Sequence, residues 1–234
     1  MRLQTLLDTL ENLATDTEIS GLSLDSRQVK PGYVFIALKG ERHHGLDFAE
    51  QAIAKGAVAV IYEPDGAGVI PEFAIQWVAV SGLADKLGAI AARFYGDPSQ
   101  QLQVIGITGT NGKTTCSQLL AQALDDSAVI GTLGWGEPDN LTPTLNTTPD
   151  ALAVQQMLGS CRDMGKRLVA MEVSSHGLQQ GRVNGVRFAG AVFTNFSRDH
   201  LDFHGSMEQY LQAKITLFKR TDLQFAVLNL DDPK

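Results

Sequence analysis

Cysteine is scarce in this chain, which has only Cys116 and Cys161 among its 234 residues. Both fall in segments that we expect to be helical, and they do not form a closely spaced pair. A small fold held together by a framework of disulfides is therefore excluded, and we expect two reduced, buried thiols.

Long apolar runs are missing as well. No run approaches the ~20 residues of a membrane span. The amino-terminal stretch MRLQTLLDTLENLATDTE carries acids among its leucines and lacks the apolar core of a signal peptide. Without secretion, the glycosylation sequons at Asn146 and Asn195 have no meaning. We therefore expect a cytoplasmic protein with no membrane insertion, and we expect it to be a monomer.

An excess of positive charge is also lacking, because 19 basic residues face 26 acidic ones and the net charge is −7. Nucleic acid is therefore not an expected partner, and phosphate groups would have to be held by local groups. Hydrophobic residues make up 44% of the chain. The length allows one or two domains with a substantial core.

Strand-like and helix-like runs alternate along the chain, with a break near Asp97-Pro98. Before the break we expect strands at 33–38, 57–62 and 77–80 and helices at 48–55 and 83–95. After it we expect strands at 104–107, 128–131, 168–173, 188–194 and 225–230 and helices at 113–124, 149–164 and 206–218. The fold class is therefore α/β: a small amino-terminal α/β domain (1–97) precedes a P-loop-type domain (98–234), a mostly parallel sheet with helices on both faces.

Local patterns predict how three of these helices are built. Thr148-Pro149-Asp150 is typical of an N-cap, a first-turn proline and a first-turn acid. Ser206-Met207-Glu208-Gln209 is typical of a capping box. The helix at 113–124 is expected to bury an apolar face made of Cys116, Leu119, Leu120, Ala123 and Leu124.

The segment VIGITGTNGKTT, Val104 to Thr115, predicts a phosphate-binding loop between a buried strand and a helix. The common form of this loop has a glycine where this chain has Ile107. Small residues and a helix N-terminus nevertheless bring free N–H groups and a partial positive charge to one point. Lys113 would reach the β- and γ-phosphates and Thr114 would hold Mg²⁺. The alternative is a plain strand–helix turn.

Three further polar clusters follow predicted strands or lie on a helix, and in an open α/β sheet they can meet at the carboxyl ends of the strands. They are Glu172, Ser174, Ser175, His176 and Arg182; Asn195, Asp199, His200, Asp202 and His204; and Lys214. Glu172 is expected to bind Mg²⁺, the alternative being a simple strand-end acid. No third ligand at a recognisable spacing supports zinc at His200 and His204, and hydrogen bonding to backbone is an equal alternative for each histidine. Lys214 is either a buried lysine of lowered pKa or a surface lysine with an exposed head.

Four stretches together resemble the Mur ligases, the ATP-dependent amide-forming enzymes of peptidoglycan precursor synthesis: GITGTNGKTT, MEVSSHGLQQGR, TNFSRDHLDFHG and AKITLF. SLDSRQVKPGYVFIALKG and NTTP are similar to the members that add the third peptide residue, meso-diaminopimelate or lysine, to UDP-N-acetylmuramoyl-alanyl-glutamate. The resemblance runs from about Leu22 to Asp232. It implies an acyl phosphate formed from ATP and then attacked by the amine of the diamino acid.

The resemblance also implies roles for individual residues. Lys113, Glu172, His200 and Lys214 would be catalytic, and Lys214 would be carbamylated. The ATP phosphates would be bound by Gly109, Thr110, Asn111, Gly112, Lys113, Thr114 and Thr115. Thr114, Glu172, His200 and Lys214 would hold two Mg²⁺ ions. The UDP-N-acetylmuramoyl-dipeptide would contact Leu24, Ser26, Glu41, Arg42, His43, Asn146, Thr147, Thr148, Ser174, Gln180 and Arg182.

The resemblance further implies a third, carboxyl-terminal domain that is absent from these 234 residues, so the fragment is expected to be inactive alone. Two other functions stay open from the residues. One is another P-loop ligase or kinase, such as a folylpolyglutamate synthetase-like enzyme. The other is a non-catalytic module that binds a nucleotide sugar. The choice between diaminopimelate and lysine also stays open.

Overall fold

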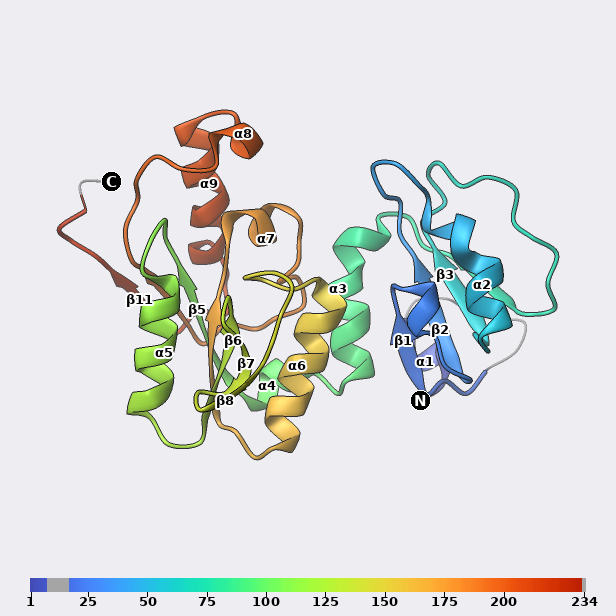
Figure 1. Cartoon of the computed structure of the whole chain (residues 1–234), viewed down its shortest axis with the longest axis horizontal. Coiled ribbons are helices and arrows are strands. Elements are labelled where there is room, and N and C mark those ends of the chain that lie inside the picture. Colours follow the sequence, from blue (N-terminus) through green and yellow to red (C-terminus); the bar gives the residue numbers. More distant parts are fainter. Residues whose placement is uncertain (8–16, 233–234) are drawn as a thin grey trace. The chain divides into compact units, whose positions relative to one another are not determined.

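The computed structural model describes residues 1–7 and 17–232, and the chain forms two compact units, Met1–Phe94 and Tyr95–Lys234 (Figure 1). Residues 8–16, part of the leucine-rich amino-terminal stretch assessed above, lie outside the described residues. No helix in the described ranges is both long and apolar enough to cross a membrane.

The first unit is built on a parallel four-stranded sheet of order β1-β2-β3-β4. Its strands are Gly21–Ser23, Tyr33–Ala37, Ala59–Tyr62 and Gln76–Ala79, and its helices are α1 (Leu3–Leu7), α2 (Ala49–Ala54) and α3 (Leu83–Phe94). Phe35 and Val60 on the sheet pack with Ala49 and Ala52 of α2 in one core cluster. The short first strand was not expected from the sequence.

The second unit is built on a seven-stranded sheet of order β11-β10-β5-β9-β6-β7-β8. The strands are β5 (Gln103–Thr108), β6 (Ser127–Gly131), β7 (Gly134–Glu137), β8 (Asn140–Thr142), β9 (Leu168–Glu172), β10 (Gly190–Phe193) and β11 (Phe225–Leu228). The helices are α4 (Pro98–Gln101), α5 (Lys113–Ala123), α6 (Ala151–Asp163), α7 (Ser175–Gln179), α8 (Leu201–His204) and α9 (Met207–Phe218). All pairs are parallel except β6–β7 and β7–β8.

Side-chain alternation along the strands divides the core of this unit into two faces, as a parallel sheet covered on both sides requires. Ile105 and Ile107 of β5 pack with Ala121 of α5. Val104 of β5 lies in a second cluster, with Leu158 of α6 and other residues of α6 and α9. Helices therefore cover both faces, as predicted, and α5 and α6 flank the sheet in Figure 1.

The predicted N-cap of helix α6 was wrong. The cap of α6 is Asp150, whose side chain accepts a hydrogen bond from the Ala153 N–H, and the helix begins at Ala151. Thr148 does not cap it, because the Thr148 hydroxyl donates to the backbone oxygen of Glu172. The capping hydrogen bond that Ser206 Oγ accepts from the Gln209 N–H is present as expected.

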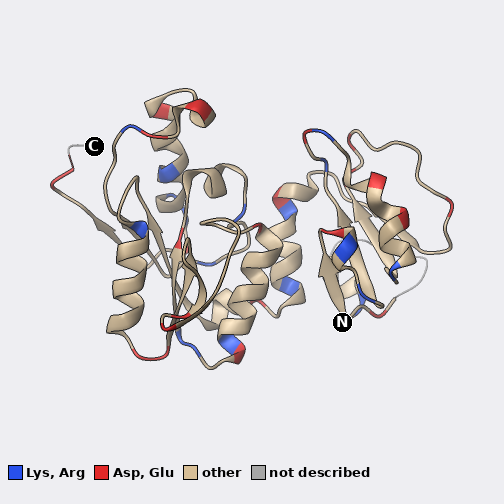
Figure 2. Ribbon diagram, viewed as in Figure 1, with Lys and Arg blue, Asp and Glu red and all other residues tan. Residues whose placement is uncertain are grey.

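The face that α5 buries also differs from the expectation. Leu119 is 60% exposed and Leu124 is exposed as well, whereas Ser117 and Ala121 are buried. The inward serine is satisfied because its hydroxyl donates to the Thr114 carbonyl. The sequence also missed the strand pair β7 and β8 and the short helices α7 and α8. Acidic and basic residues are interspersed along each unit (Figure 2).

Candidate functional site

The loop between β5 and α5 takes a conformation that depends on glycine. Gly109 has φ +146° and Gly112 has φ +82°, both in the region that favours glycine. A Cβ on Gly109 would lie 1.9 Å from the Thr194 hydroxyl oxygen, so no side chain fits there. The turn is therefore fixed by glycine although Ile107 stands where the common loop has one.

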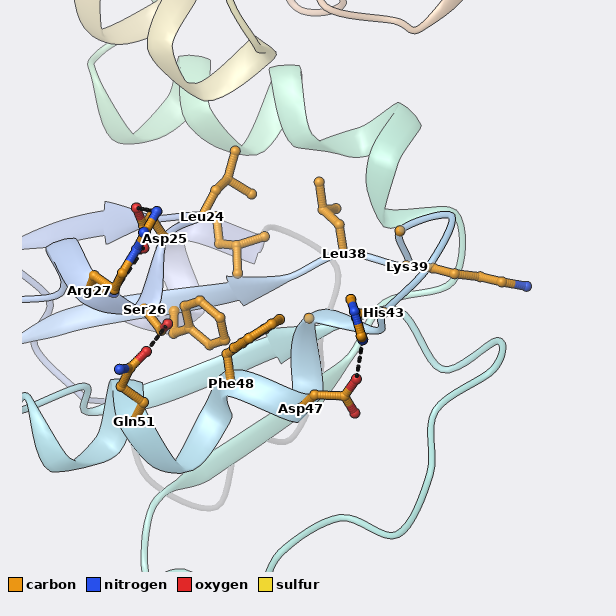
Figure 3. Close-up of a pocket in the computed structure, with 14 residues that line it drawn as sticks. Leu24, Asp25, Ser26, Arg27, Leu38, Lys39, His43, Asp47, Phe48 and Gln51 are labelled. Carbon is orange, nitrogen blue, oxygen red and sulfur yellow. Dashed lines mark hydrogen bonds and ion pairs between the residues drawn. The ribbon is translucent and has the colours of Figure 1, made fainter.

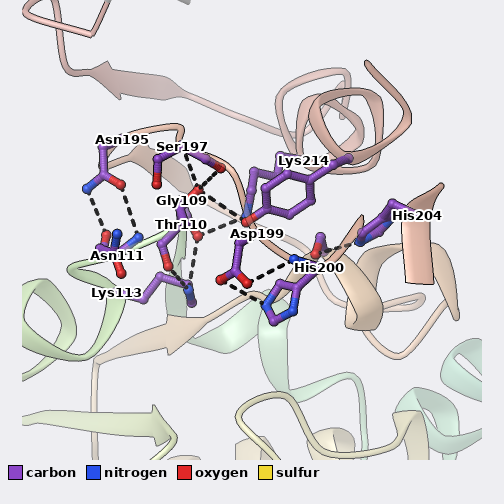
Figure 4. Close-up of polar contacts among 12 residues, drawn as sticks. Gly109, Thr110, Asn111, Lys113, Asn195, Ser197, Asp199, His200, His204 and Lys214 are labelled. Carbon is purple, nitrogen blue, oxygen red and sulfur yellow. Dashed lines mark hydrogen bonds and ion pairs between the residues drawn. The ribbon is translucent and has the colours of Figure 1, made fainter. Parts of the chain in front are cut away.

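Asn195, which follows β10, holds this loop from the side (Figure 4). Its backbone oxygen accepts from the Thr110 N–H at 2.9 Å, and its side-chain oxygen accepts from the Asn111 N–H at 3.0 Å. Its side-chain amide donates to the Asn111 carbonyl at 3.0 Å. The Thr110 hydroxyl in turn accepts from the Ser197 N–H. These bonds join the loop to the segment after β10, which is the neighbour of β5 in the sheet.

The start of α5 presents unpaired donors at the loop. The first N–H groups of a helix have no acceptor within it, and the helix N-terminus carries a partial positive charge. The backbone bond from Cys116 N–H to the Gly112 carbonyl opens this helix. Lys113 adds a cation, and its Nζ donates to the carbonyls of Gly109 and Thr110 at 2.9 Å each. Burial lowers the pKa of Lys113.

Glu172, the last residue of β9, is a buried carboxylate, only 1% exposed. The Thr114 hydroxyl at the start of α5 donates to its Oε2 at 2.9 Å. Glu172 has no ion-pair partner among the described residues. A buried negative charge paired only with neutral donors is costly, and a carboxylate and a hydroxyl are both oxygen ligands of the type that Mg²⁺ uses. The pair therefore fits a divalent cation.

Lys214 reaches the same loop from α9 and is 1% exposed, so the alternative of a surface lysine was wrong. Its Nζ donates to the Gly109 carbonyl at 2.8 Å and lies 4.4 Å from the centre of the Tyr210 ring. Burial, with repulsion from Lys113 as a second cause, lowers the pKa of Lys214 to about 7. The expected lowered pKa is thereby confirmed, and much of this amine is neutral near pH 7.

His200 lies in the segment that follows β10, and its backbone has φ +50°. Its Nε2 lies 3.5 Å from Asp199 Oδ2. The His176 ring is 4.8 Å from the His200 ring. His204 is buried, and its Nε2 lies 2.9 Å from Ser175 Oγ, so its partner is a side chain rather than backbone. Across the described ranges, no three His, Cys, Asp or Glu side chains are close enough to hold a metal ion by themselves. A cation here would need hydroxyl or phosphate oxygens as well.

The residues expected to contact a muramoyl-peptide are brought together only in part. Thr148 is buried, and its hydroxyl accepts from the Ser174 N–H at 2.9 Å. Arg182 donates to the Thr148 carbonyl at 2.7 Å. Asn146 and Gln180 are exposed. The Thr147 hydroxyl lies 3.0 Å from the hydroxyl of Thr132, a residue that was not among the expected contacts.

The first unit has its own pocket, with a volume of about 1030 Å³ (Figure 3). Leu24, Ser26 and His43 line it, together with Phe48 and Gln51 among others. The Ser26 hydroxyl donates to the Gln51 side-chain oxygen at 2.6 Å. The other two expected residues, Glu41 and Arg42, are exposed in the loop that carries His43 and are not among the lining residues.

Asp25 and Arg27 stiffen the wall of this pocket. Asp25 caps the short 3₁₀ helix Ser26–Gln28 by accepting from the Arg27 N–H, and the Arg27 guanidinium binds the same carboxylate with two bonds of 2.9 Å. These hydrogen bonds from Arg27 lower the pKa of Asp25 to about 2. The Asp25 carboxylate is therefore ionised at neutral pH and bonded to Arg27.

Sequence reasoning missed two residues at the centre of the second unit, Thr132 and Gly131. Gly131 is the last residue of the predicted strand 128–131 and of β6, which pairs with β9, and Thr132 follows it directly. Thr132 donates to Glu172 through its N–H at 2.9 Å and its hydroxyl at 3.1 Å. The sequence signal that could have identified Thr132 is its position as a polar residue directly after a buried strand.

Comparison with known proteins gives concordant matches. Residues 107–234 match the family described as the Mur ligase middle domain, and residues 18–95 match the one described as the Mur ligase family, catalytic domain. The UDP-N-acetylmuramoyl-L-alanyl-D-glutamate–2,6-diaminopimelate ligase of Alkalilimnicola ehrlichii is 51% identical over 247 aligned positions, covering 99% of this chain and 49% of that protein. The ligase of the same name from Xylella fastidiosa is 55% identical over 225 positions, 94% of this chain and 45% of that protein.

A solved structure of a UDP-N-acetylmuramoyl-L-alanyl-D-glutamate–2,6-diaminopimelate ligase is similar throughout. It has a TM-score of 0.80 and 38% identity, covering 100% of this chain and 48% of that one. The chain thus spans about half the length of the curated relatives it matches.

Proposed function

The chain belongs to the Mur ligase family, and on this premise we propose that it binds UDP-N-acetylmuramoyl-L-alanyl-D-glutamate and the phosphates of ATP for amide-bond formation with a diamino acid. The observation that carries the proposal is the convergence of Lys113, Thr114, Glu172 and Lys214 on one glycine loop. The names of the relatives favour 2,6-diaminopimelate over lysine as the acceptor of the whole enzyme.

Residues 98–234 would hold ATP, with the loop from Gly109 to Thr115 around its phosphates. The free N–H groups at the start of α5 and the Lys113 ammonium would stabilise negative charge on the triphosphate. The terminal carboxylate of the dipeptide would attack the γ-phosphate, releasing ADP and forming an acyl phosphate. The amine of the diamino acid would then displace inorganic phosphate and form the amide.

Thr114 and Glu172 would hold Mg²⁺, with His200 and Lys214 as the candidate holders of a second ion. The ion supplies positive charge that offsets repulsion between the carboxylate and the triphosphate. The neutral amine of Lys214 can add CO₂ and lose a proton, which gives a carbamate anion. Its pKa of about 7 supports this modification, because CO₂ reacts with the unprotonated amine.

Residues 1–97 would hold the uridine nucleotide in the pocket lined by Leu24, Ser26 and His43. Asn146, Thr147, Thr148, Ser174, Gln180 and Arg182 would contact the muramoyl-peptide, and Glu41 and Arg42 would contribute from the exposed loop. The pocket combines apolar side chains such as Phe48 with polar ones such as Ser26 and Gln51, and such a mixture suits a nucleobase and ribose.

Calorimetric titration of the chain with UDP-N-acetylmuramoyl-L-alanyl-D-glutamate tests the proposal, with UDP-glucose and folate as control ligands. We expect micromolar or tighter binding of the muramoyl-dipeptide and much weaker binding of both controls. Tighter binding of folate would favour a folylpolyglutamate synthetase-like ligase. Hydrolysis of ATP that does not depend on the dipeptide would favour a P-loop kinase or ATPase instead.

A further inference from the structure

The Glu172 carboxylate is oriented by hydrogen-bond donors from two segments. Thr114 at the start of α5 donates to Oε2 at 2.9 Å. Thr132, directly after β6, donates to Oε1 through its N–H at 2.9 Å and lies with its hydroxyl 3.1 Å from Oε2. Thr132 therefore contacts both oxygens of the carboxylate.

The hydroxyl of Thr132 has a second neighbour, the hydroxyl of Thr147 at 3.0 Å. A threonine hydroxyl has one proton to donate, and an ionised carboxylate only accepts. The Thr132 hydroxyl is the donor to both Glu172 Oε2 and Thr147 Oγ1, so these two acceptors share its one proton. The Thr132 hydroxyl therefore links the Glu172 carboxylate to the Thr147 hydroxyl.

Glycine at the end of β6 makes this arrangement possible. A Cβ on Gly131 would lie 2.1 Å from Glu172 Oε1. The carboxylate can therefore lie against the backbone of β6 only because residue 131 has no side chain, and this places it within reach of the next N–H, that of Thr132.

We propose that Thr132 is a positioning residue that holds the Glu172 carboxylate in the orientation that binds the cation, and that connects it to the loop carrying Thr147. This inference rests on the proposed function of the site. Hydrogen-bond partners of metal ligands fix ligand orientation, and their loss typically lowers metal affinity about 10- to 100-fold. Because Thr147 contacts Thr132, occupation of the 146–148 loop by the muramoyl-peptide would act on the same carboxylate.

The test compares the affinity of the chain for the non-hydrolysable ATP analogue AMP-PNP in excess Mg²⁺ and in EDTA. Thr132→Val keeps the N–H and the branched shape but removes the hydroxyl, and Thr132→Ser restores it. We expect Thr132→Val to weaken binding about tenfold in Mg²⁺ and to leave it unchanged in EDTA, and we expect Thr132→Ser to match the unsubstituted chain. Thr144→Val is the matched control, since the Thr144 hydroxyl donates to the Gly131 carbonyl and not to Glu172.

A second arm tests the link to the loop. Thr147→Val removes the competing acceptor and leaves the Thr132 proton to Glu172. It should therefore strengthen Mg²⁺-dependent binding up to a few-fold in the unsubstituted background and have no effect in the Thr132→Val background. Additive effects would overturn the link. Equal Mg²⁺-dependent affinity of Thr132→Val and the unsubstituted chain, or an equal loss in Thr144→Val, would overturn the positioning role while nucleotide binding stands. Absence of any AMP-PNP binding by the unsubstituted chain would overturn the proposed function and this inference with it.

Discussion

Thr114 and Glu172 are 58 residues apart in the sequence and are joined by a hydrogen bond of 2.9 Å between the threonine hydroxyl and the carboxylate. One stands at the first turn of α5 and the other at the last position of β9. Helix α5 packs against β9 and its neighbours in one core cluster, which includes Ala121 of α5 and Ala170 of β9. Core packing therefore brings Thr114 and Glu172 together. The proposed cation site is therefore built on rigid elements.

Gly131→Ala should disturb this site although it replaces no proposed ligand. The new Cβ would overlap Glu172 Oε1 and force the carboxylate away from β6. We expect Mg²⁺-dependent AMP-PNP affinity to fall at least tenfold. Gly68→Ala is the control, because a Cβ there meets nothing within 4 Å and no unusual φ is required. Unchanged affinity in Gly131→Ala would show that the position of the carboxylate does not matter.

Lys214 should make the stability of the protein depend on pH. Its pKa is about 7 in the folded chain and near 10.5 when unfolded. Between these two pH values the unfolded chain binds more protons than the folded chain, so the free energy of unfolding should rise with pH from about 7 to 10. Below pH 7 the buried Lys214 is charged, and the full cost of burying that charge lowers the free energy of unfolding.

Lys214→Met should therefore stabilise the chain by roughly 2–4 kcal/mol at pH 6–7 in CO₂-free buffer, with the difference shrinking towards pH 10. Urea unfolding at several pH values measures it. Lys219→Met, at the exposed end of the same helix, should change stability by less than about 0.5 kcal/mol at every pH. A gain for Lys214→Met that does not vary with pH would contradict the lowered pKa.

Carbamylation of Lys214 should appear as the added mass of one CO₂ on the peptide that contains this residue, when the protein is kept in bicarbonate. If the carbamate supplies negative charge beside a cation, acetate should restore part of the Mg²⁺-dependent AMP-PNP affinity lost in Lys214→Ala. Acetate should have no such effect on Lys113→Ala, where the missing charge is positive. A full-affinity Lys214→Ala variant would rule out this role.

The pocket of the first unit should serve only the UDP-sugar. Ser26→Ala removes a hydroxyl that lines the pocket and bonds to Gln51, and we expect about a tenfold loss of affinity for UDP-N-acetylmuramoyl-L-alanyl-D-glutamate. AMP-PNP binding should stay unchanged. Ser20→Ala is the matched control, because the Ser20 hydroxyl bonds to the Pro31 carbonyl outside the pocket. Equal losses in the two variants would place the uridine elsewhere.

The sequence predicted the α/β alternation and the phosphate-type loop because apolar runs, glycines and a helix start are local signals. It did not predict which face α5 buries, since Ser117 becomes an inward residue only through its bond to the Thr114 carbonyl. The wrong cap at Thr148 has a similar cause. Its hydroxyl is taken by the backbone of Glu172 and Ser174, more than twenty residues away, and Asp150 is left to cap the helix.

Thr132 could not be assigned from the sequence, because its contact with Glu172 depends on β6 lying next to β9 in the sheet, although 36 residues separate the two strands in the chain. For Lys214 the apolar neighbours in the sequence allowed either a buried or a surface side chain, and the structure shows that it is buried. Residues of the candidate site that follow strands were thus easier to find than the residues that position them.

The most direct test of the account is titration of one folded variant, Lys113→Ala, with both ligands. The Lys113 ammonium faces the loop carbonyls of Gly109 and Thr110 and lies outside the pocket that contains Ser26. We predict that AMP-PNP affinity in Mg²⁺ falls at least a hundredfold, while affinity for UDP-N-acetylmuramoyl-L-alanyl-D-glutamate stays within about twofold. Equal losses for the two ligands, or no loss for the nucleotide, would contradict the division of the chain into a nucleotide-sugar unit and an ATP-phosphate unit.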